Sequence, residues 1–172
     1  MSIKSKLVVL TSTVVASSIA LTVYSLSAMS TFQLIMCSTG EQGFYYPEFI
    51  CNAHLKQFRY NEQGANDLAE GGLDPILNLD SNMKYDIAQA FINNGLKVNA
   101  GNSYLPSPYN ALTPLQLNVI AKNVNNLKFL LRNGASVESS LELVNTLILK
   151  DPDPDPVLIE IKQLLSQYTH FC

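Results

Sequence analysis

The middle of the chain repeats itself, and this repeat constrains the fold more than any other feature. Residues 73–100 and 112–137 share a proline, an Asn-Gly pair and a valine at one common offset of 39 residues. The matched positions are Pro75 with Pro114, Asn94-Gly95 with Asn133-Gly134, and Val98 with Val137. Because a single offset aligns all of them, we interpret the two segments as copies of one structural unit.

Each copy has the signals of two short helices. Pro114 suits the first turn of a helix, and Thr113 is placed to cap it. Asp74 is the equivalent cap in the earlier copy. A second, amphipathic helix follows a break at Asn123, and Gly134 ends it in the left-handed conformation that glycine adopts freely. The apolar positions of this second helix are Leu127, Leu130 and Leu131, with Ile87, Phe91 and Ile92 in the earlier copy.

A third copy is suggested by two helical segments, residues 141–150 and 157–168, on either side of an acidic, proline-rich stretch. One helical pair cannot cover its own apolar face, so the copies must stack. The sequence therefore predicts an all-α fold in which a repeat domain fills residues 71–172. Residues 31–70, which include a predicted helix over residues 47–58, are interpreted as an N-terminal cap.

The second copy resembles an ankyrin repeat. Residues 113–117, TPLQL, and residues 127–137, LKFLLRNGASV, match the family's start of the first helix and end of the second. Residues 98–100, VNA, match the family's closing motif. The resemblance implies an ankyrin-like stack of about three helix-turn-helix repeats. Gln116 replaces a histidine that bonds between repeats in that family, so the resemblance implies looser order here, and Asn78 stands where a core leucine is expected.

The offset of 39 residues exceeds the family's 33. The extra residues belong in the loop over residues 101–109, GNSYLPSPY, which joins two repeats as a finger. Exposed aromatic side chains on a loop stiffened by proline suit binding, since they lose little entropy. Tyr104, Leu105 and Tyr109 are therefore candidate partner contacts, although they could instead fold back over the stack.

Residues 1–30 are expected to form a signal anchor or a signal peptide. Lys4 and Lys6 precede an uncharged run over residues 7–33, whose most apolar part is residues 7–29. A helix of this length can span a bilayer core. Both a signal anchor and a signal peptide would keep the lysines in the cytoplasm and place the chain after about residue 30 on the other side of the membrane. A buried core helix is a further interpretation, but such helices rarely run this long without a charge.

Two interpretations of this N-terminal segment remain possible. The length favours an uncleaved anchor, with membrane contact through residues 7–29. A cleaved signal requires small residues before the cut, for which Ser25 and Ser27 offer a weak site. The predicted location is the periplasm, either anchored in the inner membrane or released.

The three cysteines, Cys37, Cys51 and Cys172, all follow the apolar run, which fits an oxidising compartment. Cys37 with Cys51 closes a short loop and is the favoured disulfide. A bond between Cys51 and Cys172 would join the two ends of a stack, and three free thiols are the remaining alternative.

No catalytic set is recognisable, so the chain is not expected to be an enzyme or to bind a cofactor or metal. The only histidines, His54 and His170, lie near opposite ends of the exported part. A net charge of −3 and scattered lysines argue against nucleic acid. Asp151, Asp153 and Asp155 alternate with proline, which suits a stiff acidic loop better than a calcium site.

These features predict a protein that binds other proteins. The resemblance implies that Lys122 and Asn123, at the repeat turn, face a partner. The aspartates of the acidic loop are further candidate partner contacts beside the finger. Small exported ankyrin-repeat proteins resemble periplasmic immunity proteins, which sterically block type VI secretion effectors, often phospholipases. A structural adaptor of a cell-envelope complex is the alternative, and a degenerate periplasmic enzyme or metal-binding protein is a third hypothesis.

Overall fold

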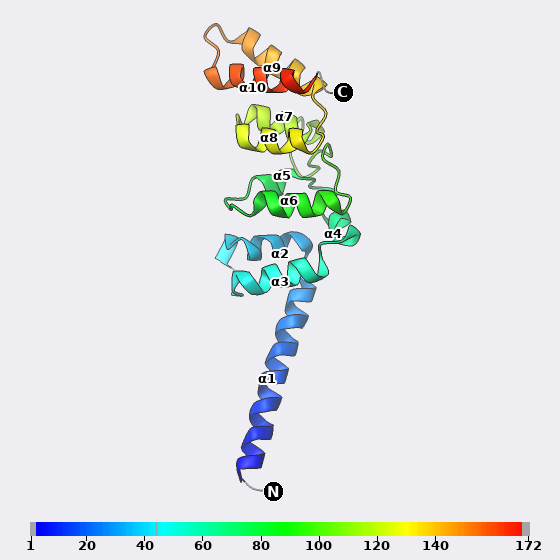
Figure 1. Ribbon diagram of the computed structural model, residues 1–172, viewed down its shortest axis with the longest axis vertical. Helices are drawn as coiled ribbons and strands as arrows, with labels where there is room; N and C mark the ends of the chain where they lie inside the picture. Colours follow the sequence, from blue (N-terminus) through cyan, green and yellow to red (C-terminus); the bar gives the residue numbers. More distant parts are fainter. Residues whose placement is uncertain (1–2, 44, 170–172) are drawn as a thin grey trace. The chain divides into compact units, whose positions relative to one another are not determined.

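The computed structural model describes residues 3–43 and 45–169, and within these ranges the chain is helical and forms no strand (Figure 1). It divides into two compact units, the first ending at Phe58 and the second beginning at Arg59. The predicted all-α class is therefore confirmed. α4 (Glu62–Asp67) belongs to the second unit.

The first unit contains α1 (Ile3–Ala28), α2 (Thr31–Ser38), the 3-10 turn η1 (Glu41–Gly43) and α3 (Glu48–Phe58). Ser30 separates α1 from α2: its hydroxyl accepts from the Gln33 backbone N–H, and the Gln33 side chain accepts from the Ser30 N–H. This capping box starts a new helix instead of extending α1.

The membrane expectation rests on α1. No single helix among the residues with described side chains is long and apolar enough to cross a membrane. A bent pair, Ser12–Ala28 with Thr31–Ser38, meets these criteria by length and composition, and its two helices meet at 117°.

A disulfide joins α2 to α3. Cys37 and Cys51 are bonded, their Cα atoms lie 5.8 Å apart, and both side chains are buried. The bond closes the short loop favoured by the sequence. Leu34 and Leu55 are fully buried in the same pair of helices. Cys172 and His170 lie outside the described residues.

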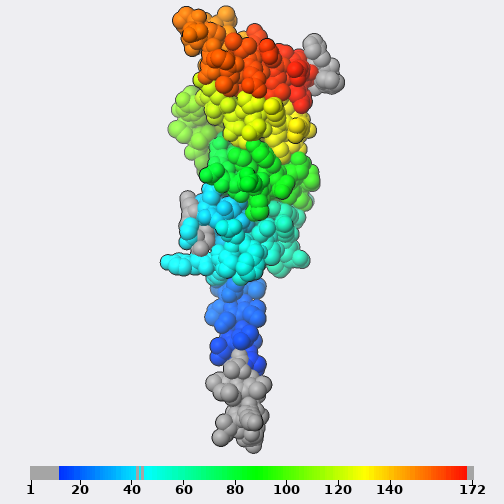
Figure 2. Space-filling model, turned by 60° about the vertical axis from the view of Figure 1, so that its left-hand side comes forward, coloured from blue at the N-terminus to red at the C-terminus, as the bar shows by residue number. Residues whose placement is uncertain are grey.

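The second unit contains three successive helix pairs, which lie in layers in Figure 1. Figure 2 shows their side chains in contact from green through yellow to red. The pairs are α5 (Asp74–Leu77) with α6 (Lys84–Asn93), α7 (Pro114–Ile120) with α8 (Val124–Arg132), and α9 (Glu138–Lys150) with α10 (Pro156–Tyr168). The 3-10 turn η2 (Tyr109–Ala111) precedes α7.

The middle pair forms as its sequence predicts. The Thr113 hydroxyl accepts from the Gln116 N–H, and the Gln116 side chain accepts from the Thr113 N–H, which caps α7. Leu127 and Leu130 are fully buried on one side of α8. Gly134 follows α8 with φ of 81°, and Gly95 follows α6 with φ of 102°. Both glycines thus have the left-handed conformation expected at a helix end.

Polar side chains link the first two pairs. Asn126 is fully buried in α8, and its amide donates to the Leu77 carbonyl at 3.1 Å and to the Asn118 side chain at 2.8 Å. The Tyr85 hydroxyl donates to the Asn126 side-chain oxygen at 2.9 Å. Gln116 serves the α7 cap, and Asn126 supplies hydrogen bonds between the first two pairs.

Two expectations for the first copy are wrong. Asp74 does not cap α5: the N-cap residue is Leu73, which has no side-chain cap, and Asp74 is the first helical residue. Asn78 is not at a core position, because it is exposed at the end of α5, and the matching Leu117 is only half-buried. Leu77 and Leu79 fill the core there instead.

Candidate functional site

A cleft of about 230 Å³ lies where α5, α7 and the loop before α7 meet. The loop contributes Leu105 and Tyr109, two of the residues that the sequence singles out. The remaining lining residues come from α5 and α7 or follow them directly; they are Asp74, Asn78, Leu117, Asn118 and Ala121. The cleft therefore combines apolar walls with a carboxylate and two amides.

Asp74 is the charged group of this cleft, and it is only 7% exposed. One carboxylate oxygen accepts from the Asn102 amide at 2.8 Å, and the other accepts from the Asn78 amide at 3.1 Å. Asn102 is itself buried at the start of the loop. These two bonds fix the carboxylate and tie the loop to α5, so the position of the loop depends on Asp74.

The loop has a second attachment at Glu70. The Ser103 N–H donates to the Glu70 carbonyl at 2.8 Å, and the Tyr104 hydroxyl donates to the Glu70 carboxylate at 3.0 Å. This hydrogen bond, and then the negative charge of Glu70, raise the pKa of Tyr104 above its ordinary value. The Tyr104 ring lies against Gly71 and remains 70% exposed. Tyr104 thus folds back on its own chain yet offers most of its surface to solvent.

Lys122 and Asp155 form an ion pair at 2.7 Å. Lys122 has a left-handed backbone with φ of 55°, and Asn123 caps α8 by accepting from the Asn126 N–H. Asp155 caps α10 by accepting from the Val157 N–H at 2.8 Å. The hydrogen bond from Lys122, followed by the one from Val157, lowers the pKa of the Asp155 carboxyl.

These candidate contacts therefore divide into two groups. Lys122, Asn123 and Asp155 have partners within the chain that hold the turn and the acidic loop in place. Asp151 and Asp153 are exposed, and the Asp151 carboxylate accepts from the Asp153 N–H. Among the residues with described side chains, no three histidine, cysteine, aspartate or glutamate residues gather in a way that could hold a metal.

The chain matches none of the family models, curated proteins or solved structures with which it was compared.

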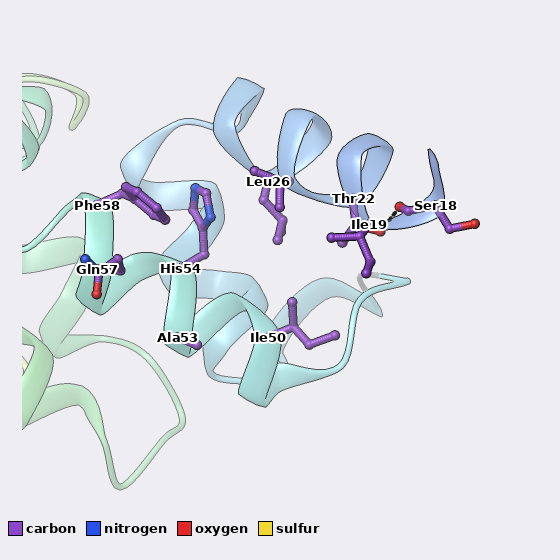
Figure 3. A pocket seen from close by; sticks show the side chains of 10 residues that line it. Ser18, Ile19, Thr22, Leu26, Ile50, Ala53, His54, Gln57 and Phe58 are labelled. Carbon is purple, nitrogen blue, oxygen red and sulfur yellow. Dashed lines mark hydrogen bonds between the residues drawn. The ribbon is translucent and has the colours of Figure 1, made fainter. Parts of the chain in front are cut away.

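A larger groove, of about 600 Å³, lies within the first unit between α1 and α3 (Figure 3). Ile19 and Leu26 line it from α1, and Ile50 and Phe58 line it from α3. His54 also lines it; its side chain is buried, with the ring centroid 4.6 Å from that of Phe58. His54 is therefore packed into an apolar wall.

Sequence reasoning did not single out the polar residues of the cleft region as functional candidates; these are Asp74, Asn78, Asn102 and Asn118. Asp74 and Asn102 are 28 positions apart, and only the folded loop brings them together. The sequence offered one signal for this site. Asp74, just before Pro75, is four positions from Asn78, a spacing at which two side chains contact each other on a helix.

Proposed function

We propose that the second unit is an ankyrin-type binding domain of about three repeats. The layered helix pairs, the capping box at Thr113 and the glycine ends at Gly95 and Gly134 support this assignment. Repeat stacks of this kind bind proteins across surfaces built from successive units. The cleft between α5, α7 and the loop is such a surface, since two repeats and their connection contribute to it.

We further propose that α1 directs the domain across the inner membrane and anchors it there or is cleaved. The helix has 26 residues, which corresponds to about 39 Å. It carries no charged residue after Lys6. Its apolar side chains Val14, Ile19 and Leu21 are 59%, 60% and 68% exposed. Such exposure is costly in water and favourable in lipid. The Cys37–Cys51 bond also suits an oxidising compartment.

Together these proposals favour an immunity protein that binds a type VI secretion effector of the phospholipase type in the periplasm and blocks its active site. The cleft and the exposed face of its loop carry this proposal, because they are a preformed surface of the size and polarity that binds another protein's side chains. Tyr104 and Tyr109, 70% and 47% exposed, add aromatic contact area beside it.

A structural adaptor of the cell envelope is the second candidate. Two aliphatic side chains of the last helix pair favour it: Leu149 is 86% exposed and Ile159 is 42% exposed. A permanent partner would cover a more apolar surface than a transient one.

A protection assay separates the two candidates. Cells that produce a periplasmic toxin encoded beside this gene are given either the full chain or a variant that lacks residues 1–29. The immunity role requires survival with the full chain and death with the truncated one. Equal death in both cultures, with the full chain present in the envelope, would reject that role. Retention of a resident envelope complex by the same chain would then favour the adaptor.

A further inference from the structure

We propose that the cleft beside Asp74 binds a cationic side chain, arginine or lysine, of the protein partner. The inference rests on the proposed binding function and specifies the chemistry of one contact. It starts from Asp74, a residue that is 7% exposed and that lines an open cleft of about 230 Å³.

A buried carboxylate is unfavourable unless hydrogen bonds and an opposite charge compensate for its lost hydration. Asp74 has the hydrogen bonds, one from Asn102 and one from Asn78. No ion pair joins it to any of the residues that the structure describes. Each carboxylate oxygen can accept more than one bond, so capacity remains for an N–H donor that enters from the cleft.

The lysine nearest to the cleft in sequence does not neutralise Asp74. Lys122 follows the lining residue Ala121, but its ammonium is 2.7 Å from the carboxylate of Asp155. The negative charge of Asp74 is therefore left for a partner. An ionised donor is the strongest complement, because charge-assisted bonds are about twice as strong as neutral ones.

The other walls suit the rest of such a side chain. Leu105, Leu117 and Ala121 can cover the methylene groups of an arginine or a lysine, whose charged end then reaches Asp74. Tyr109 places an aromatic ring at the same cleft, and aromatic faces attract guanidinium and ammonium groups. A neutral side chain of equal size would gain the apolar contacts without the ionic one.

Short peptides test this assignment without the toxin. The full chain, labelled with ¹⁵N in detergent, is titrated with acetyl-Gly-Arg-Gly-amide, with the lysine version, and with a version that carries neutral citrulline. We expect saturable shifts of the side-chain amides of Asn78 and Asn102 with arginine or lysine. We expect at least tenfold weaker binding of citrulline, which corresponds to about 1.4 kcal/mol.

Three variants localise the binding. Asp74→Asn should reduce arginine affinity to the citrulline level, whereas Glu160→Gln, which removes an exposed carboxylate of α10, should leave it unchanged. Since Asp74→Asn also alters the loop attachment, Ala121→Leu serves as a second variant that narrows the cleft and keeps Asp74. It should weaken arginine binding at least fivefold. Equal binding of citrulline and arginine, or no saturable shift at the cleft, would overturn the assignment.

The two proposals fail separately. If arginine binding depends on Asp74 but the chain gives no protection from the toxin, the immunity role is rejected and the assignment of the cleft as a cation site is kept. Protection that Asp74→Asn leaves intact, together with no peptide binding, would reject the cleft and retain the immunity role.

Discussion

The Tyr85 hydroxyl donates a 2.9 Å hydrogen bond to Asn126, 41 residues further along the chain. Tyr85 lies in α6 and Asn126 in α8, so the bond joins consecutive helix pairs. Asn126 in turn reaches the Leu77 carbonyl and Asn118. One buried amide therefore has partners in α5, α6 and α7 and helps to fix how the first two pairs stack.

Replacing Asn126 should destabilise the second unit strongly. Asn126→Leu would leave the Leu77 carbonyl and two side-chain groups without this hydrogen-bond partner. Each buried polar group that loses its hydrogen bond costs about 1–3 kcal/mol. We expect a loss of at least about 3 kcal/mol in the free energy of unfolding, measured with urea. Asn125→Leu is the matched control, since Asn125 is an exposed asparagine on the same helix. Equal effects of the two substitutions would show that the buried amide is not a link between the pairs.

Gly134 should tolerate asparagine far better than valine. Its φ is 81°, and a Cβ added there would meet no atom within 4 Å, so only the backbone conformation limits substitution. Valine fits left-handed backbone poorly, whereas asparagine adopts it more readily. We expect Gly134→Val to cost more than about 1 kcal/mol and Gly134→Asn clearly less. An unchanged melting temperature for the valine variant would contradict the assigned end of α8.

The Lys122–Asp155 pair should make the free energy of unfolding depend on pH in the acidic range. The pKa of the Asp155 carboxyl is lower in the folded protein than in the unfolded chain. The stabilisation from the pair is therefore complete above the unfolded value, about pH 4, and is lost as the pH falls through the folded value.

The free energy of unfolding of Lys122→Met, compared with the original chain from pH 7 to pH 2, tests this dependence. The difference between the two proteins should shrink toward zero in acid. Lys128→Met removes an exposed lysine of α8 and should show no such trend. A difference that stays constant down to pH 2 would indicate that Lys122 acts through something other than its ammonium charge.

Loss of the disulfide should weaken the first unit. Cys37 and Cys51 are 14 positions apart, and closing a loop of about 15 residues stabilises a fold by about 3 kcal/mol. The double variant Cys37→Ser, Cys51→Ser should therefore melt at a lower temperature, and a reductant should lower the melting temperature of the original chain to the same value. Cys172→Ser should change neither result. A chain whose melting is insensitive to reductant would argue against the bond.

The helix pairs could be predicted because their signals are local. Thr113, Pro114 and Gly134 each act within one helical turn, and the leucines of α8 recur on one side of the helix. The earlier copy has weaker signals. Asp74 has the residue type of a cap but bonds to Asn102 instead, and α5 keeps only 4 helical residues.

The polar contacts of the core and cleft could not be predicted, because they join distant residues. Asn126 reaches Leu77 across 49 positions, and nothing local in the sequence identifies that partner. The pairing of Lys122 with Asp155 across 33 positions also depends on packing. Sequence patterns identify which side of a helix is apolar, whereas the choice of hydrogen-bond partner follows from how the layers meet.

The most direct test of the proposed function is a titration of the purified toxin encoded beside this gene with the full chain in detergent. Enzymatic activity should fall in proportion to the added chain and vanish near one equivalent. Asp74→Asn should raise the amount of chain required, while Glu160→Gln, which removes an exposed carboxylate of α10, should not. Full toxin activity in a several-fold excess of folded chain would contradict the account.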